Sequence, residues 1–457
     1  MLGAGPAGLV TAWRLAEAGH QVTVLEAADQ VGGMSASIEV GGQRVDLGSH
    51  RLHPATPGPI LDLVGDLLGT DLQVRPRNGR LRLGDRWVGF PLRVGDLARS
   101  LPPMLTARLA TDAITTTLAG LAPERAADSF ASETNARFGP TIATDFYGRY
   151  ARKLYGLEPD ELDVELAERR VSAGSPIDIA RRLVRAGRPA GRTFLYPRRG
   201  YGQIVDRLAE AAVDAGADIR TGTPVESIAQ TENAVALTTR HGQLSADVVP
   251  ASLPRTTLAR LLTPAPSERI MAAVDRQRVR SMLLVYLVLD QPQYTPFDAH
   301  YIPNDDVHVA RLSEPKNYRT GDDPADRTVL CAEIACWPDD DLVSWSPDRL
   351  GAMVAGELGR VGLPAPTPAW TETRFLPSVY PVFDRAGRAD RATLDRWGAN
   401  LGRVLPMGRQ GLGVIDNLHH VLTMGLAAAD VIGADGSVNE TRWRQHLNQF
   451  ADHTVED

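Results

Sequence analysis

The chain has 457 residues, more than a single hydrophobic core usually holds, which predicts two or more domains. Its apolar content of 43% and charged content of 23% are ordinary for a globular protein. The formal net charge of −7 argues against nucleic acids and anionic membrane surfaces as main partners.

A glycine-rich turn opens the chain, with Gly3, Gly5 and Gly8 in the spacing G-x-G-x-x-G around Pro6 and Ala7. An amphipathic alanine-rich stretch and the apolar run Val22–Leu25 follow, so the turn lies between a strand and a helix. In such a unit the backbone N–H groups at the helix N-terminus bind a pyrophosphate. Glu26 ends the second strand, where a carboxylate holds a ribose 2′-hydroxyl. The stretch therefore predicts a dinucleotide site.

The strand before this turn is short. Only Met1 and Leu2 precede the first glycine, whereas the first strand of such a unit needs about five residues. We expect upstream codons to encode the rest of the strand.

A second glycine pair, Gly32 and Gly33, follows the second strand and is followed by Met34. A dinucleotide that also contacts a loop beyond that strand is more typical of FAD than of NAD. FAD is therefore the predicted cofactor.

Next, residues 37–40 and 43–47 alternate around two glycines and predict a hairpin. The hairpin leads to the loop Gly48-Ser49-His50-Arg51-Leu52-His53. Two histidines three residues apart could bind a metal, but no acid-and-histidine cluster accompanies them, and no metal site is predicted. The loop is expected to run beside the flavin ring, and the alternative is a solvated loop with incidental histidines.

The rest of the chain alternates between helical and mixed patterns. Residues 94–186 have a helical pattern, which includes a continuous helix over Thr141–Leu154, and short strands are expected at His300–Ile302 and His308–Leu312. The predicted fold is α/β, with a discontinuous Rossmann-like FAD-binding domain, an inserted α+β substrate domain and a helical region. The FAD-binding domain is assigned to residues 1–90, 196–262 and 388–457, and the inserted part to 91–195 and 263–387.

Two cysteines, Cys331 and Cys336, lie in an apolar run with opposite strand parity, which predicts buried free thiols on opposite faces. No signal segment opens the chain, and no apolar run approaches the ~18–20 residues that span a bilayer. These observations predict a cytoplasmic protein without a membrane span.

The order of these motifs resembles the FAD-dependent amine oxidase and protoporphyrinogen oxidase superfamily, and within it the branch around UDP-galactopyranose mutase and its redox-active relatives. The glycine turn with Glu26 matches the dinucleotide fingerprint of the family, and Gly32-Gly33 matches its second glycine motif. An arginine commonly follows that pair, where this chain has Met34. The loop from Gly48 to His53 is similar to the G-x-H-x-F-H loop beside the flavin, with Leu52 in the aromatic position.

Later motifs agree in order. Tyr150, Lys153, Tyr155 and Gly156 resemble the signature Y-x-x-K-x-W-G, and the strand with Val225 is similar to the one that meets adenine. The remaining matches are Arg311 to Asn317 with R-x-x-E-P-K-N, Tyr380-Pro381-Val382 with Y-P-V, and Gly408, Arg409, Asp416 and Asn417 with the last flavin motif.

The resemblance implies an FAD-dependent oxidoreductase that removes a hydride from a C–N, C–O or C–C unit of a small-molecule metabolite, in bacterial secondary metabolism. Molecular oxygen is a candidate electron acceptor. In this interpretation a neutral histidine accepts a proton and Arg311 holds an anionic or carbonyl group. The candidate catalytic residues are His50, His53, Arg311, Lys316 and Tyr380. The alternatives are a non-redox mutase acting on a nucleotide sugar, and a flavin-binding scaffold without chemistry.

Overall fold

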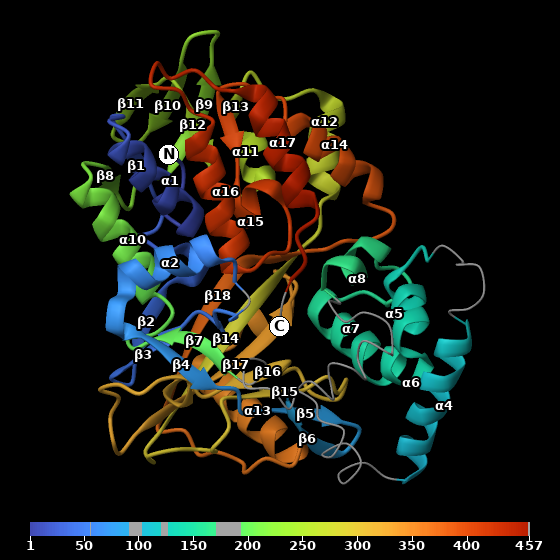
Figure 1. Cartoon of the computed structure of the whole chain (residues 1–457). Helices are drawn as coiled ribbons and strands as arrows, with labels where there is room; N and C mark the ends of the chain where they lie inside the picture. The colour runs from blue at the N-terminus through green and yellow to red at the C-terminus, as the bar shows by residue number, and fades with distance from the viewer. Residues whose placement is uncertain (55, 91–102, 120–126, 171–192, 456–457) are drawn as a thin grey trace.

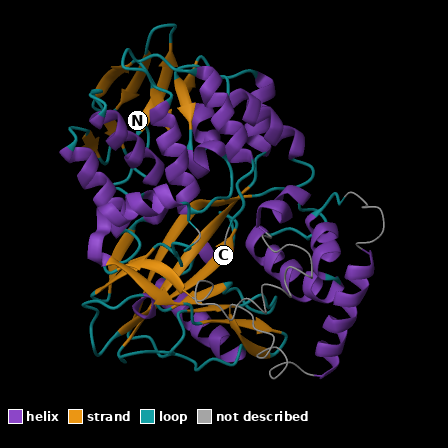
Figure 2. Ribbon diagram, viewed as in Figure 1, coloured by secondary structure: helices purple, strands orange, loops and turns teal. Residues whose placement is uncertain are grey.

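The computed structural model describes residues 1–54, 56–90, 103–119, 127–170 and 193–455. A nucleotide-binding part, a part built on a large sheet and a helical region lie against one another (Figure 1). The helices gather at two places and the long strands at a third (Figure 2).

The nucleotide-binding part is built on a parallel sheet. Leu2 forms parallel bridges to Leu25 on one side and to Ala251 on the other, so it lies at the centre of the sheet. The strand order is therefore β8, β1, Leu2, β12 and β19, and each strand pair is parallel. The strands are β1 (Thr23–Leu25), β8 (Asp218–Arg220), β12 (Val249–Ala251) and β19 (Val404–Pro406).

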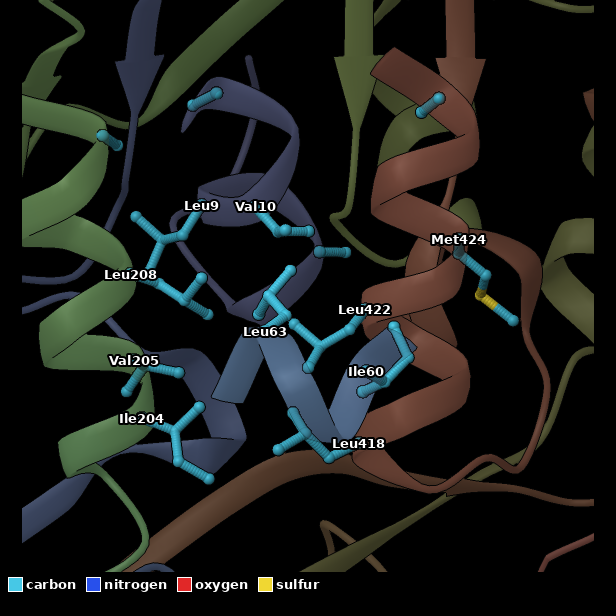
Figure 3. Close-up of a cluster of buried hydrophobic side chains, with 14 of the residues drawn as sticks. Leu9, Val10, Ile60, Leu63, Ile204, Val205, Leu208, Leu418, Leu422 and Met424 are labelled. Carbon is cyan, nitrogen blue, oxygen red and sulfur yellow. The ribbon is translucent and has the colours of Figure 1, made fainter. Parts of the chain in front are cut away.

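Helices cover one face of this sheet. Side chains of α1, α2, α10 and α16 point toward one another in a buried apolar cluster (Figure 3). The helices α1 and α16 approach closely because Gly425 faces α1, and a Cβ there would lie 2.6 Å from the Ala7 carbonyl oxygen. The helices are α1 (Pro6–Glu17), α2 (Gly58–Leu68), α10 (Gln203–Asp214), α16 (Leu418–Asp430) and α17 (Glu440–Ala451).

The other face packs on a small sheet of order β11-β10-β9-β13 and on helices near it. A parallel sheet with helices on one face and a small sheet on the other is the Rossmann-like arrangement that the sequence predicts. The elements are β9 (Val225–Gln230), β10 (Val235–Thr239), β11 (Gly242–Ala246), β13 (Leu262–Thr263), α11 (Arg255–Leu261), α12 (Glu268–Arg276), α14 (Arg388–Gly398) and α15 (Gly408–Leu412).

A seven-stranded mixed sheet forms the second part, with the order β18-β14-β17-β16-β15-β5-β6. Strand β14, second from one edge of the sheet, is buried along almost all of its length because α13 covers one face and side chains from residues 38–47 and 151–155 pack on the other. The elements are β5 (Gly79–Leu83), β6 (Arg86–Phe90), β14 (Val279–Leu289), β15 (Ala299–Tyr301), β16 (Arg311–Ser313), β17 (Thr328–Cys336), β18 (Trp370–Pro381) and α13 (Pro347–Arg360).

Two predictions about this sheet need correction. The predicted division places residues 1–90 in the FAD-binding domain, whereas β5 pairs with β15 and joins the seven-stranded sheet. The predicted strand His308–Leu312 is a strand only from Arg311 to Ser313. The carboxylate of Glu357 accepts hydrogen bonds from the backbone N–H groups of His308 (2.8 Å) and Val309 (3.1 Å), and these bonds replace strand-to-strand hydrogen bonds there.

The thiols of Cys331 and Cys336 are buried and free as predicted, and they lie in apolar clusters on opposite faces of the sheet.

Two short antiparallel pairs link the parts: β2 (Ser37–Val40) with β3 (Gln43–Asp46), and β4 (Leu72–Pro76) with β7 (Thr193–Pro197). The first pair is the predicted hairpin. The helical region contains α4 (Pro103–Ala119), α5 (Phe130–Phe138), α6 (Pro140–Ile142), a π-helical turn η3 (Ala143–Gly148), α7 (Arg149–Tyr155) and α8 (Val164–Arg170). The predicted helix over Thr141–Leu154 is thus interrupted by a π-helical turn. Predicted elements within 91–102 and 171–192 lie outside the described residues.

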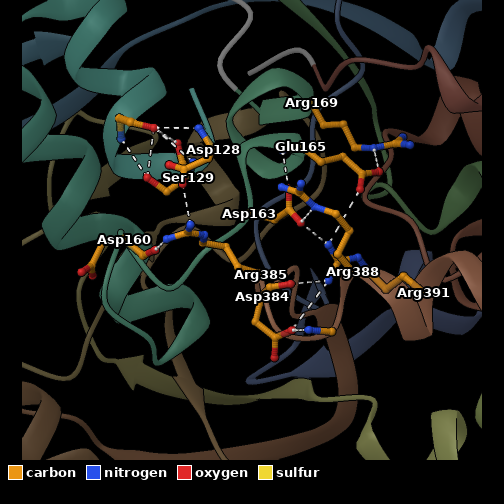
Figure 4. A network of polar contacts seen from close by, with 12 residues as sticks. Asp128, Ser129, Asp160, Asp163, Glu165, Arg169, Asp384, Arg385, Arg388 and Arg391 are labelled. Atoms are coloured by element: carbon orange, nitrogen blue, oxygen red, sulfur yellow. Dashed lines mark hydrogen bonds and ion pairs between the residues drawn. The ribbon is translucent and has the colours of Figure 1, made fainter. Parts of the chain in front are cut away.

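A buried ion-pair network docks the helical region on α14 (Figure 4). The carboxylate of Asp163, whose side chain is 1% exposed, accepts two hydrogen bonds from Arg388 (2.7 and 2.8 Å) and one from Arg391 (2.6 Å). Arg391 is also buried, so these bonds form in a medium that screens charge weakly. The network lies at the start of α8, whose last residue, Arg170, lines the cavity described below. Within the described ranges, no helix has both the length and the apolar character needed to cross a membrane.

Candidate active site

A cavity of about 650 Å³ runs from the carboxyl ends of the parallel strands to the large sheet. Its walls come from the glycine turn, the loop after β3, the ends of β15, β16 and β18, and the turn before α16. In parallel α/β sheets, ligands bind at the carboxyl ends of the strands, as they would here.

The turn at one end of the cavity has the shape of a phosphate cradle. Gly3 has a φ of 95°, and Gly5 is the N-cap of α1 without a side-chain cap. The first N–H groups of α1 therefore point toward the cavity without partners from the helix. At Gly8, a Cβ would lie 1.9 Å from the carbonyl oxygen of Gly3, so only glycine fits there.

Glu26 lies in the cavity wall and is held firmly by the backbone. One carboxylate oxygen accepts the N–H of Ala4 at 2.7 Å, and the other accepts the N–H of Ala28 at 2.9 Å. The position beyond the second strand is that of a ribose-binding acid.

Most predicted cofactor-binding residues line this one cavity. They are Gly3, Gly5, Pro6, Ala7, Glu26, Gly33, Met34, Ser49, His50, Val225, Gly408, Arg409, Asp416 and Asn417. Gly8, Gly32 and Gly48 are absent from the wall and shape the turns beside it: Gly32 and Gly48 have positive φ, and Gly32 donates its N–H to the Ala4 carbonyl at 2.7 Å. The turn with no room for a side chain, the free helix N-terminus and the acid fit a dinucleotide.

The loop after β3 is anchored to the large sheet. The N–H of Ser49 donates to Glu333 at 2.8 Å, and the Ser49 hydroxyl bonds to the Tyr318 hydroxyl. Arg51 donates to Asp298 at 2.9 Å, and its guanidinium lies about 5 Å from the rings of Phe194 and Tyr318. These contacts exclude the alternative of a solvated loop.

His50 lies over Tyr201, with ring centroids 5.1 Å apart and planes 16° apart. Its Nδ1 is buried without a hydrogen-bond partner among the described residues. Burial, together with the positive charges of Arg311 and Arg409, lowers the pKa of His50 to about 3. The imidazole is therefore neutral at pH 7 and a weak proton acceptor. The neutral state suits a hydrogen-bonding role, and the role of proton acceptor stays a prediction.

Arg311 is held by Glu333, its cross-strand neighbour on β17. Nε and Nη2 donate to the two carboxylate oxygens at 2.8 and 2.6 Å, which leaves Nη1 for the cavity that Arg311 lines. Glu314, which is closer in sequence, instead accepts the N–H groups of Tyr294 and Thr295. A bidentate pair of this kind fixes a guanidinium in one orientation.

Two arginines approach the ring of Tyr380, which also lines the cavity. The guanidinium of Arg170 is 5.1 Å from its ring centroid and that of Arg409 is 5.2 Å away. Arg409 donates Nη2 to the carbonyl of Val379 at 2.8 Å, and its Nε is buried without a partner among the described residues. Burial lowers the pKa of Arg409, and Arg170 adds to this effect.

One catalytic candidate lies elsewhere. Lys316 is absent from the cavity wall, and its ammonium donates to three backbone carbonyls: Pro292 at 2.9 Å, Arg327 at 3.0 Å and Pro324. An ammonium has three donors, and all are occupied. We therefore remove Lys316 from the catalytic set. His50, His53, Arg311 and Tyr380 all line the cavity.

Several residues in or behind the cavity wall were not predicted from the sequence. Arg51 lies within the predicted loop and could have been included with the histidines. Glu333 had a usable signal, because a lone acid in the apolar run VLCAEIAC needs a buried cation. Arg77, Arg170 and Tyr201 have no distinguishing local pattern.

Comparison with known proteins decides the family. The model of the flavin-containing amine oxidoreductases matches residues 6–373. This chain belongs to that family. Membership makes it a flavin oxidoreductase of the amine oxidase family, and it confirms the predicted superfamily and fold class.

Curated relatives match over short stretches. Putrescine oxidase of Kocuria rosea is 43% identical over 79 residues, which is 17% of this chain and 16% of that protein. The 1-hydroxycarotenoid 3,4-desaturase of Flavobacterium sp. (strain P99-3) is 50% identical over 48 residues, which is 10% of each chain. This chain thus matches less than a fifth of the length of either protein.

Solved structures match over nearly the whole length. Reduced UDP-galactopyranose mutase aligns with a TM-score of 0.80 at 21% identity and covers 99% of this chain and 98% of its own. Putrescine oxidase bound to putrescine aligns with a TM-score of 0.63 at 19% identity, over 94% of this chain and 97% of its own. An oxidoreductase of Methanosarcina mazei aligns at 0.64 and 17% identity, over 94% and 99%. At these identities the alignments establish the fold.

Proposed function

We propose that this chain is an FAD-dependent oxidoreductase that removes a hydride from a C–N, C–O or C–C unit of a small-molecule metabolite. The observation that carries the proposal is the single cavity, which joins the glycine turn and Glu26 to His50, Arg311 and Tyr380. A nucleotide held at the turn would extend toward these side chains.

The nucleotide end is assigned to named groups. The N–H groups that start α1 would hold the pyrophosphate, Glu26 the ribose, and Val225 the adenine side. The positive end of α16, which begins after Asn417, would favour negative charge on the ring system. When bound, FAD supplies a hydride acceptor.

At the substrate end, the residues of this chain would orient the substrate and polarise its reacting bond. His50 stays neutral and offers a hydrogen bond, and Arg311, fixed by Glu333, offers Nη1 to an anionic or carbonyl group. His53 and Tyr380 complete the proposed set. Arginines gather at the wall: five of them line the cavity, of which Arg51 and Arg311 pair with Asp298 and Glu333, and the acids among the described lining residues are Glu26 and Asp416. The arginines are Arg51, Arg77, Arg170, Arg311 and Arg409.

This charge favours a substrate with a carboxylate or phosphate group. A diamine such as putrescine carries two positive charges at neutral pH and is disfavoured in the same field. We therefore propose an anionic substrate, with molecular oxygen as a candidate acceptor.

A second candidate is a non-redox mutase acting on a nucleotide sugar. It is favoured by the arginines, because Arg170, Arg311 and Arg409 reach the cavity from three different elements and could clamp a diphosphate. The likeness to a mutase structure supports the fold of this candidate but not its reaction.

One experiment separates the candidates. The flavin is first extracted from the purified protein and identified by mass. The loaded protein is then mixed anaerobically with anionic and cationic candidate substrates, and the flavin absorbance is followed. An oxidoreductase bleaches its flavin with the right substrate and yields hydrogen peroxide or a reduced acceptor afterwards. A mutase turns over only after chemical reduction, and absence of flavin contradicts both candidates.

A further inference from the structure

The segment after α17, residues 452–455, folds back onto the cavity wall. Its base is fixed because Trp443 and Phe450 of α17 are buried in the core of the nucleotide-binding part. The segment ends against α8, where the N–H of Val455 donates to the carbonyl of Arg169 at 2.7 Å. In Figure 1 this end of the chain, marked C, lies between the large sheet and the helices α7 and α8. The segment therefore bridges the nucleotide-binding part and the helical region.

Val455 belongs to the wall at the proposed substrate end. It is 7% exposed and lines the cavity. It lies in one buried apolar cluster with Tyr155, Tyr380 and Ile415. A valine in this place gives the Tyr380 end of the cavity an apolar, water-excluding side.

His453 holds the segment through a cluster of imidazoles beside one carboxylate. Its ring stacks on that of His420, with centroids 4.1 Å apart, and its Nδ1 is 3.5 Å from Oδ1 of Asp416. Nδ1 of His420 is 3.3 Å from the same oxygen. The Asp416 side chain is fully buried and belongs to the cavity wall. The ring of His419 lies 4.0 Å from that of His420.

Asp416, His420 and His453 could supply metal ligands, but their arrangement does not suit a shared ion. Histidine binds a metal along the in-plane lone pair of a ring nitrogen. The rings of His420 and His453 are stacked with planes only 17° apart, so their in-plane lone pairs run nearly parallel and do not converge on one point, although both Nδ1 atoms lie near Asp416. Nδ1 of His420 also accepts the N–H of Asn417 at 3.3 Å. The cluster is therefore better suited to holding the segment in place.

We propose that residues 452–455 form a strap that closes the substrate end of the cavity. Val455 is its wall residue and His453 its anchor on α16. The inference rests on the proposed function only in assigning the Tyr380 end to the substrate. With the strap in place, water and solutes have less access to the flavin from this side.

The test uses the full-length, flavin-loaded protein and measures acrylamide quenching of the bound-flavin fluorescence. The variants are His453→Ala and Val455→Asp, and Thr454→Ala is the matched control because Thr454 is exposed in the same segment. We expect a several-fold rise in the quenching constant for the first two variants, at unchanged flavin content, and no change for the control.

Amide hydrogen exchange shows independently whether a substitution has released the segment from α8. The Val455 amide, bonded to Arg169, should exchange faster in His453→Ala than in the wild type. If Val455→Asp fails to hold flavin, Val455→Ala replaces it and should give a smaller rise in quenching. Unchanged quenching in a variant whose segment exchanges faster overturns the proposal. Neither readout needs a substrate, so failure of the proposed reaction is distinguishable from failure of the strap.

Discussion

Replacing Glu333 with glutamine tests how the loop of His50 and the arginine of the large sheet are held together. Glu333 accepts hydrogen bonds from both, from the N–H of Ser49 at 2.8 Å and from Arg311 at 2.8 and 2.6 Å. Removing one partner of a buried ion pair costs about 3–5 kcal/mol, because the other charge stays buried without compensation. Since the side chain of Arg311 is 20% exposed and glutamine keeps one acceptor, we expect a loss of about 2–3 kcal/mol.

Thermal unfolding measures this loss. An unfolding entropy of about 2.1 cal/mol/K per residue gives about 1 kcal/mol/K for this chain, so Tm should fall by about 2–3 °C. Arg311→Met should cost a similar amount, and the double variant should cost less than the two together. The affinity for flavin should also fall in Glu333→Gln because the Ser49 loop loses its anchor. An unchanged Tm, or strictly additive losses in the double variant, would refute the reasoning.

Four further predictions use simpler readouts. Gly8→Ala should abolish flavin retention because its Cβ would lie 1.9 Å from a carbonyl oxygen, while Gly65→Ala, in open space on α2, should retain flavin; absorbance of the purified proteins checks both. Asp163→Asn should lower the unfolding free energy by about 2–3 kcal/mol, since Arg391 loses a buried charged partner while Arg388 is 56% exposed and asparagine keeps one acceptor oxygen, and a denaturant titration that shows no loss would contradict this. Lys316→Met should lower Tm without changing the rate of flavin reduction, and a slower reduction step would return Lys316 to the site. His50 has a folded pKa of about 3 and an unfolded value of about 6.5, so stability should fall as pH falls between these values, and His50→Asn should flatten that part of the Tm profile.

The cofactor end could be predicted from the sequence because its chemistry is local. A phosphate cradle needs glycines at fixed spacing within one turn, and Gly3, Gly5 and Gly8 meet that need within a few residues. Glu26 follows at the distance that one helix and one strand impose. These residues line a common cavity or shape the turn beside it.

The substrate end depends on contacts between distant segments, so local patterns could not predict it. Arg170 and Arg409 come together beside the ring of Tyr380, although well over two hundred residues separate them in sequence. Lys316 matched a motif, yet backbone carbonyls occupy its three donors. The lowered pKa of His50 arises from burial and from two arginines on other elements, so the spacing of residues in the loop could not predict it.

The central claim is that one cavity holds a flavin and places an anionic metabolite beside it for hydride removal. Anaerobic mixing of the flavin-loaded protein with matched anionic and cationic substrates, followed by flavin absorbance, tests it most directly. The account predicts bleaching by an anionic compound without added reductant, and little or none by putrescine. Bleaching by putrescine, or turnover only after chemical reduction, would contradict it.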